Sequence, residues 1–262
     1  MKNKIILGVV MLVLMGMGRA YAAYDHQYVY WQEVLKSYTH EGRVNYKALK
    51  ENNHEFKMAL QTIESVSKTE MEAFDIKQKK AFWINAYNVS VIKTILDHYP
   101  IKRGFSLKAI AFPSNSIQQI PDVWDSPILH TAGQNLSLND IENKILRPEF
   151  KDPRIHFAIV CASIGCPVIR SEVYTQEKLD QQLLSQIQLF LSDPLKARYD
   201  KTKDTLYLSP IFKWFKTDFE QAGGVIVFVK KYTSAGSFDE ISDQTQIQWL
   251  GYDWNLNEEH SK

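Results

Sequence analysis

The chain has 262 residues, of which 45% are hydrophobic and 12% aromatic, and a formal net charge of +1 at pH 7. This length and composition are enough to bury one substantial hydrophobic core. The 31 basic residues are nearly balanced by 30 acidic ones, so no excess of positive charge is available to neutralise phosphates, and we expect no nucleic-acid partner.

Residues 1–22 have the pattern of a cleavable signal peptide. Lys2 and Lys4 precede an apolar run that ends at Ala20-Tyr21-Ala22, a small-residue pattern that signal peptidase accepts. The run is shorter than the roughly 20 apolar residues that cross a bilayer, and no other segment approaches that length. We therefore expect a periplasmic or secreted protein without a membrane span after removal of the signal.

The remainder, residues 23–262, is predicted to form one α+β domain. No repeat, low-complexity tract or Gly/Ser-rich linker divides it. Hydrophobic periodicity and capping residues predict helices at 28–38, 46–65, 78–97, 137–146 and 177–191 and after Ser209-Pro210. Short strands are predicted in a hairpin at 128–137, at 155–161 and at 204–208. The fold class is therefore helix-rich α+β with a small sheet.

Two asparagines lie on the helix 78–97, which is apolar on nearly every side and therefore predicted to be buried in the core. Asn85 and Asn88 are three residues apart, hence on one face, and buried amides need hydrogen-bonding partners. One interpretation is that they bond the backbone of the proline-containing segment 100–127. The other is that they bind a substrate amide or an oxyanion.

Glu142 lies among the apolar positions of the helix 137–146 and should point inward. A carboxylate there must gain a cationic or hydrogen-bonding partner or become protonated. Arg147, Arg154 and His156 are the nearest candidates in sequence. A structural ion pair and a general acid are both open for Glu142, and the two arginines are candidates for substrate binding.

His156 and the two cysteines are the remaining candidate catalytic residues. In a strand at 155–161, alternation places His156 and Cys161 on opposite faces, about 16 Å apart along the extended chain. Cys166, returned by a turn at Gly165, would then be the better partner for His156, or Cys161 would pair with a distant histidine such as His98 or His130. His156 could equally be a core histidine that holds Glu142 or a backbone carbonyl.

Three interpretations of the cysteines are open. In an oxidising compartment, a C-x4-C pair with a glycine inside can close as a disulfide between Cys161 and Cys166, and this is the interpretation we favour. The second is a reactive thiol. The third is a metal site, which is disfavoured because no second Cys or His cluster accompanies His156. We therefore predict no metal and no cofactor. Ser163 lacks the G-x-S-x-G context of a serine nucleophile.

These residues fall in short motifs spread over nearly the whole chain. In chain order the motifs are 42–46 (GRVNY), 81–88 (AFWINAYN), 136–142 (LSLNDIE), 146–147 (LR), 152–158 (DPRIHFA), 161–167 (CASIGCP), 209–214 (SPIFKW) and 218–219 (DF). Together they resemble the bacterial family called domain of unknown function 547, DUF547. The resemblance implies one undivided domain and no catalytic assignment. Two positions depart from the family pattern, which often has His where this chain has Asn143 and Asp where it has Asn45.

Two main functions remain open, and enzymatic status is not decided by the sequence. The first is an exported binding or structural module with a Cys161–Cys166 disulfide, whose partner is an unknown peptide or small molecule. The second is a thiol-dependent hydrolase or acyl transferase, distantly like papain or transglutaminase, acting on a periplasmic peptide or cell-wall fragment. Its catalytic residues would be Cys166, Cys161, His156 and Glu142, with Asn85, Asn88, Arg147 and Arg154 binding substrate. A weaker third hypothesis uses only Glu142 and His156 as acid and base.

Overall fold

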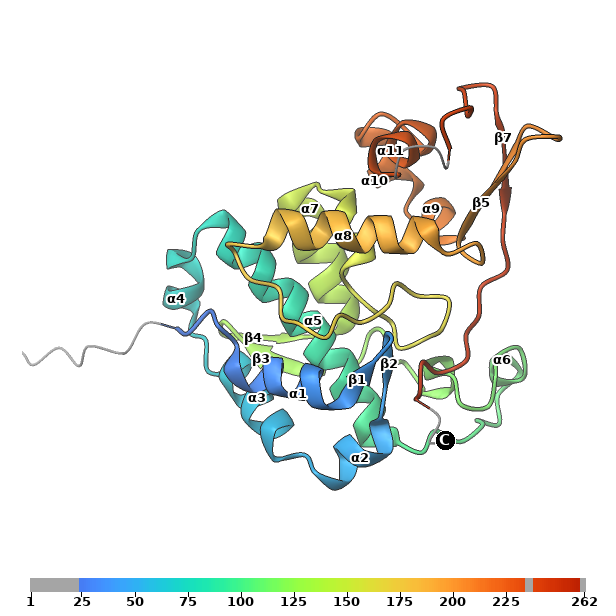
Figure 1. Cartoon of the computed structure of the whole chain (residues 1–262). Helices are drawn as coiled ribbons and strands as arrows, with labels where there is room; N and C mark the ends of the chain where they lie inside the picture. The colour runs from blue at the N-terminus through green and yellow to red at the C-terminus, as the bar shows by residue number, and fades with distance from the viewer. Residues whose placement is uncertain (1–23, 234–237, 260–262) are drawn as a thin grey trace, which may run out of the picture.

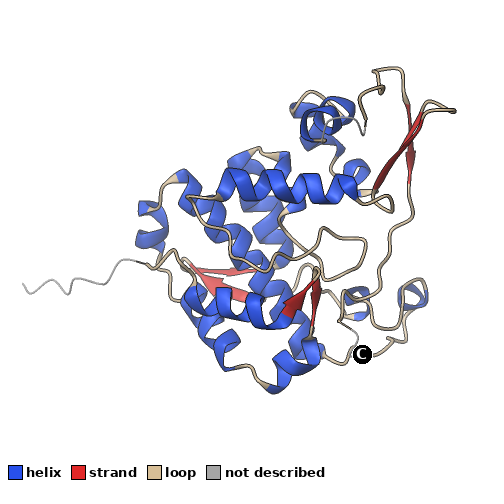
Figure 2. Ribbon diagram, viewed as in Figure 1, coloured by secondary structure: helices blue, strands red, loops and turns tan. Residues whose placement is uncertain are grey.

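The structure is a computed structural model that describes residues 24–233 and 238–259, so the predicted signal peptide lies outside the described residues. Helices predominate, and the strands are few and short (Figure 2). This confirms the predicted helix-rich α+β fold class. Among the described residues, no helix is long and apolar enough to cross a membrane.

The N-terminal half is helical apart from one small hairpin. Its elements are α1 Val29–Tyr38, β1 Thr39–His40, β2 Arg43–Val44, α2 Tyr46–Glu51, α3 His54–Glu64, α4 Lys68–Ala73 and α5 Ile76–His98. The predicted helix 46–65 is thus two helices, because α2 ends at Asn52, whose amide group donates back to the carbonyl of Ala48 (3.2 Å), and Asn53 precedes the first residue of α3.

The middle of the chain contains short elements. They are α6 Leu107–Ile110, the 3₁₀-helix η1 Ile117–Gln119, the hairpin of β3 Leu129–Thr131 and β4 Gln134–Leu136, the π-helix η2 Asp140–Leu146, α7 Arg147–Phe150 and the 3₁₀-helix η3 Pro153–Phe157. The predicted hairpin at 128–137 is confirmed, with its turn at Ala132 and Gly133, both at positive φ.

The C-terminal part combines helices with a three-stranded sheet. Its elements are α8 Leu179–Ser192, β5 Ala197–Asp200, β6 Thr205–Leu208, α9 Ile211–Trp214, α10 Lys216–Gln221, α11 Val225–Tyr232 and β7 Gln246–Trp249. The sheet order is β5-β6-β7, antiparallel between β5 and β6 and parallel between β6 and β7. After β7 the chain returns along the right-hand side of Figure 1 to the region of β2, where Val44 and Glu258 form a parallel bridge.

Helix α5 passes through the middle of the molecule, between α1–α3 on one side and α8 on the other (Figure 1). A capping box of Asp75 and Gln78 fixes its start. Every residue from Ala81 to Leu96 except Lys93 is buried. The uniformly apolar sequence predicted this burial, because a helix without a polar face must be covered on all sides.

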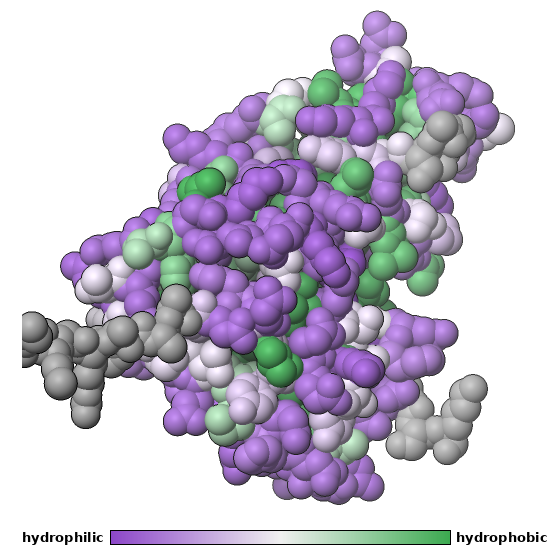
Figure 3. All heavy atoms as spheres, turned by 60° about the vertical axis from the view of Figure 1, so that its left-hand side comes forward, coloured by the Kyte–Doolittle hydropathy of each residue, from purple (hydrophilic) through white to green (hydrophobic). Residues whose placement is uncertain are grey.

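Buried hydrophobic residues form two clusters. The larger gathers side chains of α1–α5 with those of the middle segments, and the smaller gathers α8, the β5–β6 strands and α9–α11. The 3₁₀-helix η3 joins them, since Ile155 belongs to the first cluster and Phe157 to the second. On the face drawn in Figure 3, hydrophobic residues lie in small patches among hydrophilic ones.

The predicted strand 155–161 is wrong. The chain forms η3 up to Phe157 and then continues without regular structure, and Asp152 begins the 3₁₀-helix by accepting from the amide of Arg154 (3.1 Å). The side chain of Asn88 makes the backbone hydrogen bonds that a neighbouring strand would otherwise make. Its amide group donates to the carbonyl of Ala158 (3.0 Å) and accepts from the amide of Val160 (3.0 Å). The alternation argument that separated His156 from Cys161 therefore does not hold.

Candidate functional site

A pocket of about 310 Å³ opens beside the two cysteines. Its lining includes all four residues that the sequence proposed as catalytic, namely Glu142, His156, Cys161 and Cys166. The side chains come from η2, from η3 and from the irregular chain that follows η3. Only folding brings them together, because each element is short and held by different neighbours.

The segment from Cys161 to Cys166 is held by the returning C-terminal chain. The amide of Gly165 donates to the carbonyl of Asp253 (2.8 Å), and the amide of Asn257 donates to the carbonyl of Ala162 (3.0 Å). Ala162, directly after Cys161, has φ 56°, a left-handed conformation that is costly for a residue with a Cβ. Such strain persists only where surrounding contacts fix the backbone, and it is concentrated at functional sites.

The sulfur of Cys161 is surrounded by groups that can donate a hydrogen bond. Its Sγ lies 2.9 Å from Oγ of Ser163 and 3.1 Å from the hydroxyl of Tyr252. Burial raises the pKa of Cys161, but hydrogen bonds from Cys166, Ser163 and Tyr252 outweigh it and hold this pKa below its ordinary value. These donors favour the thiolate form of Cys161, and the side chain is only partly buried.

Cys166 differs from Cys161 in every one of these respects. It is buried, and its Sγ accepts a hydrogen bond from the backbone amide of Cys161 (N–S 2.8 Å). Burial raises its pKa well above the ordinary value, and the neighbouring charge of Cys161 adds to the increase. Cys166 therefore favours the protonated thiol, and Cys161 is the member of the pair with the lower pKa.

The disulfide that the sequence favoured is absent from this structure. Both cysteines are free, and their sulfurs lie near each other but not at bonding distance. The reason is local geometry, since the sulfur of Cys166 contacts the amide of Cys161 while the sulfur of Cys161 contacts Ser163 and Tyr252.

Glu142 projects into the pocket from the π-helix η2. Ser137 and Asp140 begin this helical region with the predicted reciprocal cap, with bonds of 2.9 and 3.0 Å. A π-helical turn inserts an extra residue per turn, and such turns recur at functional sites. Burial raises the pKa of Glu142 to about 7 against the opposing charge of Arg147, and the nearby Cys161 adds to the increase. Oε2 of Glu142 accepts from the hydroxyl of Tyr87 at 3.4 Å.

His156 is bound by a carboxylate and an aromatic ring, not by a cysteine. Its Nε2 lies 2.8 Å from Oδ2 of Asp218, and its ring stacks on Phe215 with centroids 3.8 Å apart. Burial lowers the pKa of His156 against the opposing effect of Asp218, so the ring is neutral. Donation from Nε2 leaves Nδ1 as an acceptor; Nδ1 is buried without a hydrogen bond, 3.8 Å from Oε1 of Glu142.

Arg147 contacts the same carboxylate from the other side. Its Nε and Nη2 donate to the two oxygens of Asp218 at 2.7 and 3.0 Å, a bidentate pair. The carboxyl of Asp218 is partly buried, which raises its pKa, but the contacts with His156 and Arg147 hold it far below its ordinary value. Arg147 does not line the pocket, but its charge lowers the pKa of Glu142 and its guanidinium lies over the ring of Phe215, both of which do.

The two asparagines on α5 are fully engaged with backbone. Asn88 holds Ala158 and Val160, next to Cys161, as described above. Asn85 donates to the carbonyl of Tyr174 (2.7 Å) and accepts from the amide of the same residue (3.1 Å). Both asparagines therefore bind backbone, as the structural interpretation predicted. The backbone that they bind is at residues 158–160 and 174, however, and not in the segment 100–127. Their binding of substrate stays a prediction.

Arg154 lies apart from the cysteine pocket. It donates to both oxygens of Asp152 from Nε (2.9 and 3.1 Å) and to Asp180 from Nη2 (3.1 Å). It lines a different cavity together with Lys80. A role of Arg154 at the cysteine pocket finds no geometric support.

Aromatic side chains form much of the pocket wall. The lining includes Trp124, Trp214, Tyr252 and Trp254, which come from three separate segments. Trp214 and Trp254 stack with centroids 5.9 Å apart, and Tyr252 lies within 5 Å of both rings. Among the described residues that line the pocket there is no lysine or arginine. The site therefore suits an uncharged group with apolar faces.

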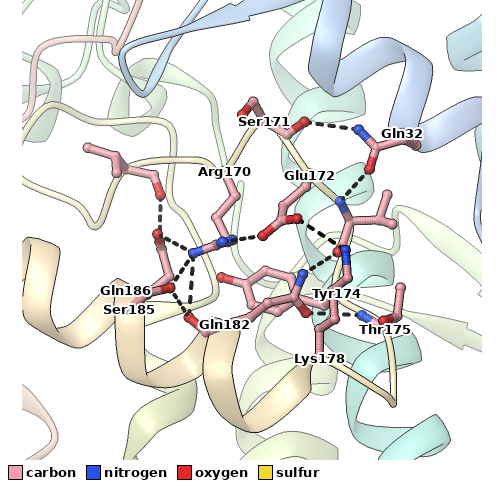
Figure 4. Close-up of polar contacts among 12 residues, drawn as sticks. Gln32, Arg170, Ser171, Glu172, Tyr174, Thr175, Lys178, Gln182, Ser185 and Gln186 are labelled. Atoms are coloured by element: carbon pink, nitrogen blue, oxygen red, sulfur yellow. Dashed lines mark hydrogen bonds and ion pairs between the residues drawn. The ribbon is translucent and has the colours of Figure 1, made fainter.

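Hydrogen bonds connect the chain that follows the cysteine segment to α8 (Figure 4). Arg170 donates to Oγ of Ser185 (2.8 Å) and pairs with Glu172. Gln182 donates to the carbonyl of Val173 (2.7 Å). These contacts fix one end of the cysteine segment on a long helix, while the C-terminal chain fixes its middle.

Residues 71–191 match the model of a family described as Protein of unknown function, DUF547. The match supports the resemblance to the DUF547 family that the sequence motifs indicated. Searches of curated proteins and of solved structures returned no match. The distant similarity to papain or transglutaminase therefore stays a prediction. The described residues hold no group of three or more His, Cys, Asp or Glu side chains placed to bind a metal.

Both departures from the DUF547 pattern have visible contacts. Asn45 precedes α2 and accepts from the amide of Ala48 (3.0 Å), a cap that Asp provides equally well. Asn143 accepts from Nη1 of Arg147 (2.7 Å) and donates to Oδ1 of Asn139 (3.1 Å), which lines the pocket, although Asn143 itself does not line it.

Three residues of the site were missed as candidates. Asp218 and Tyr252 lie 62 and 91 residues from their partners His156 and Cys161. Tyr87, on the buried face of α5, resembles ordinary core in sequence. The sequence signal that could have identified Asp218 was its place in one of the DUF547-like motifs, at 218–219. Nothing in the sequence near Tyr252 indicated a contact with sulfur.

Proposed function

We propose that this protein is a thiol-dependent hydrolase or acyl transferase in which Cys161 is the nucleophile. The observation that carries the proposal is the place of its sulfur, in a pocket and within hydrogen-bonding distance of the hydroxyls of Ser163 and Tyr252. Hydrogen bonds to an anion favour its charged form. Thiolate formation therefore rests on the Cys166 thiol and the two hydroxyl donors, and a histidine partner is not required.

Glu142 is the proposed general acid and base. Its pKa of about 7 keeps both protonation states populated near neutral pH, which is what proton transfer in both directions needs. It lines the same pocket as Cys161, close enough for the charge of the thiolate to affect its pKa. This assignment joins the thiol hypothesis with the acid–base role considered for Glu142 from the sequence.

The reaction then has two balanced steps. The Cys161 thiolate attacks the carbonyl carbon of an amide or ester and a C–S bond forms. The C–N or C–O bond to the leaving group breaks, and the protonated Glu142 gives its proton to the departing amine or alkoxide. In the second step, water or an acceptor amine attacks the thioester and gives its proton to the Glu142 carboxylate. The C–S bond breaks and the thiolate returns. Water as the second reactant gives hydrolysis, and an amine gives acyl transfer.

His156 is assigned a positioning role. Its neutral ring is fixed by Asp218 and Phe215, and its bare Nδ1 faces Glu142. A lone pair near a carboxylate disfavours the charged form, which supports the high pKa of Glu142. His156 has no hydrogen bond to either sulfur, so a Cys–His dyad is not part of the proposal.

The aromatic wall and the lack of a lining cation support an uncharged acyl portion with apolar faces. A peptide or cell-wall fragment in the periplasm or outside the cell fits this description and the leader-like segment of the sequence. A noncatalytic binding module is the competing outcome. In that case the same pocket would hold a ligand without forming a bond to sulfur.

Acylation of the native protein tests the proposal. With p-nitrophenyl acetate, we expect a burst of p-nitrophenolate and an intact mass that carries one acetyl group on Cys161. Cys161→Ser should abolish both signals, while the matched control Cys166→Ser should keep them, because a hydroxyl can also accept from the amide of Cys161. Circular dichroism establishes that each variant is folded. A burst of equal size in Cys161→Ser, or none in the native protein, would overturn the proposal.

The role of Glu142 needs a separate readout, because any reactive thiol can attack an activated ester. We expect Glu142→Gln to keep the burst and to slow the later steady-state release by at least about tenfold, since deacylation lacks its base. Unchanged steady-state release would remove Glu142 from the mechanism while leaving Cys161 in place.

A further inference from the structure

A second cavity, of about 470 Å³, shares no lining residue with the cysteine pocket. It is lined by residues from the start of α5, the connection between α7 and η3, and the end of α11. Its volume falls within the range of small-molecule sites. The cationic side chains that line it are Lys80, Lys151, Arg154 and Lys231, and its one carboxylate is Asp152.

The single carboxylate is already occupied by two of the cations. Nζ of Lys80 and Nη2 of Arg154 both lie 2.8 Å from Oδ2 of Asp152. Their hydrogen bonds lower the pKa of Asp152 although burial raises it. Asp152 therefore holds the two cations in fixed positions, and Arg154 also pairs with Asp180, which lies outside the lining, so the surplus positive charge of the cavity comes from Lys151 and Lys231. Nη1 of Arg154 has no hydrogen bond among the described residues.

The other two cations have no carboxylate. Lys151 and Lys231 are exposed and make no ion pair or hydrogen bond within the described part of the chain. Lys151 follows α7 at φ 47°, and Lys231 lies in the last turn of α11, so the two come from elements far apart in sequence. Tyr232, next to Lys231, adds a phenol to the lining.

We propose that this cavity binds a small phosphate-class oxyanion, either the free ion or the phosphoryl group of a small molecule. The chain as a whole is nearly neutral, so the excess of positive charge here is local. A concave wall with an excess of one sign of charge concentrates ions of the opposite sign. Nη1 of Arg154 is the donor that its contacts with Asp152 and Asp180 leave over, and the ammonium groups of Lys151 and Lys231 are point charges of the kind that bind phosphate oxygens.

The site is independent of the proposed reaction at Cys161. It gives Arg154, which the sequence suggested as a substrate-binding residue, a ligand of its own outside the cysteine pocket. Failure of the phosphate proposal would leave the thiol proposal untouched, and failure of the thiol proposal would not affect this one.

Calorimetric titration of the full chain with inorganic phosphate tests the proposal. The variant replaces the two exposed cations, Lys151→Gln with Lys231→Gln, and the matched control removes the same charge elsewhere, Lys36→Gln with Lys57→Gln. Lys36 and Lys57 are also exposed and unpartnered in the described part of the chain. We expect the association constant of the double variant to fall at least about tenfold, and that of the control to stay within about twofold. Added KCl should weaken binding by the native protein.

A second arm separates a soluble ligand from a lipid headgroup. Vesicles of phosphatidylglycerol and of phosphatidylcholine are sedimented with the native protein, and we expect neither to carry it down at about 0.15 M salt. The proposal fails if the native protein shows no saturable phosphate binding, or if the double variant binds phosphate as the native protein does. It also fails if phosphatidylglycerol vesicles bind through these lysines while phosphate does not.

Discussion

The hydroxyl oxygen of Tyr252 lies 3.1 Å from Sγ of Cys161, although 91 residues separate the two in sequence. The contact exists because the chain after β7 returns and pairs with the cysteine segment through Gly165 and Ala162. The pKa of the Cys161 thiol therefore depends on the segment that follows β7. Two predictions test this dependence.

Tyr252→Phe removes one donor from the sulfur and should raise the pKa of Cys161. A hydrogen bond to a charged group contributes about 1.5–3 kcal/mol, which corresponds to a rise of about 1–2 pH units. The rate of iodoacetamide alkylation, followed by mass spectrometry from about pH 5 to about pH 9, reports this pKa directly. Tyr199→Phe is the control, since Tyr199 bonds Asp204 in the sheet. An unchanged inflection in Tyr252→Phe would contradict the proposed stabilisation.

Gly165→Ala should displace the returning chain without changing any donor. A Cβ at Gly165 would lie 2.9 Å from the amide nitrogen of Asp253 and 3.0 Å from the ring of Tyr252. We expect a loss of about 1–3 kcal/mol in the free energy of unfolding, together with a higher alkylation pKa. Gly251→Ala is the matched control, because nothing lies within 4 Å of its Cβ. Equal behaviour of the two variants in urea unfolding and alkylation would show that the close approach does not matter.

Glu142→Gln should change how stability depends on pH. The pKa of Glu142 is about 7 in the folded protein and near 4.5 when unfolded, so between these values the folded state binds more protons. Its contribution to stability is therefore largest at low pH and is lost as the pH rises to about 7. The shift corresponds to about 3 kcal/mol. In urea unfolding, the free energy of unfolding of the variant relative to that of the native protein should rise between about pH 4.5 and about pH 7. A constant difference across that range would contradict the raised pKa.

Asp218→Asn removes the charge that holds Arg147 and His156. Breaking a partly buried network of this kind should cost about 2–4 kcal/mol of unfolding free energy at neutral pH. The pKa of Asp218 is depressed in the folded state, so its contribution is present above its ordinary value of 3.8 and is lost as the pH falls below it. In chemical denaturation, the difference in unfolding free energy between the native protein and Asp218→Asn should therefore become smaller in acid.

Asp97→Asn provides the comparison for Asp218→Asn. Asp97 pairs only with Lys93 on the surface of α5, and exposed pairs of this spacing contribute less than about 0.5 kcal/mol. A cost of similar size for both substitutions would show that the network around His156 adds little to stability.

Local sequence was sufficient for several elements. The uniformly apolar positions of α5 predicted a buried helix, and Ser137 with Asp140 predicted the helical start that orients Glu142. Periodicity failed between 155 and 161, where an apolar run was predicted as a strand. The run is instead held by the side chain of Asn88, and no sequence pattern distinguishes a strand partner from an asparagine on a distant helix.

The sequence by itself determined which residue types were available for chemistry, the buried central helix and the inward direction of Glu142, because these follow from local periodicity and capping. The tertiary structure alone decided that Cys161 is the thiol with the lower pKa, that Cys166 is its buried neighbour, and that His156 is bound to Asp218. The pKa of Cys161 and the contact of His156 depend on segments about 60 to 90 residues away in sequence. Hydrogen bonding and burial set the pKa of a side chain, and both are properties of its neighbours in space.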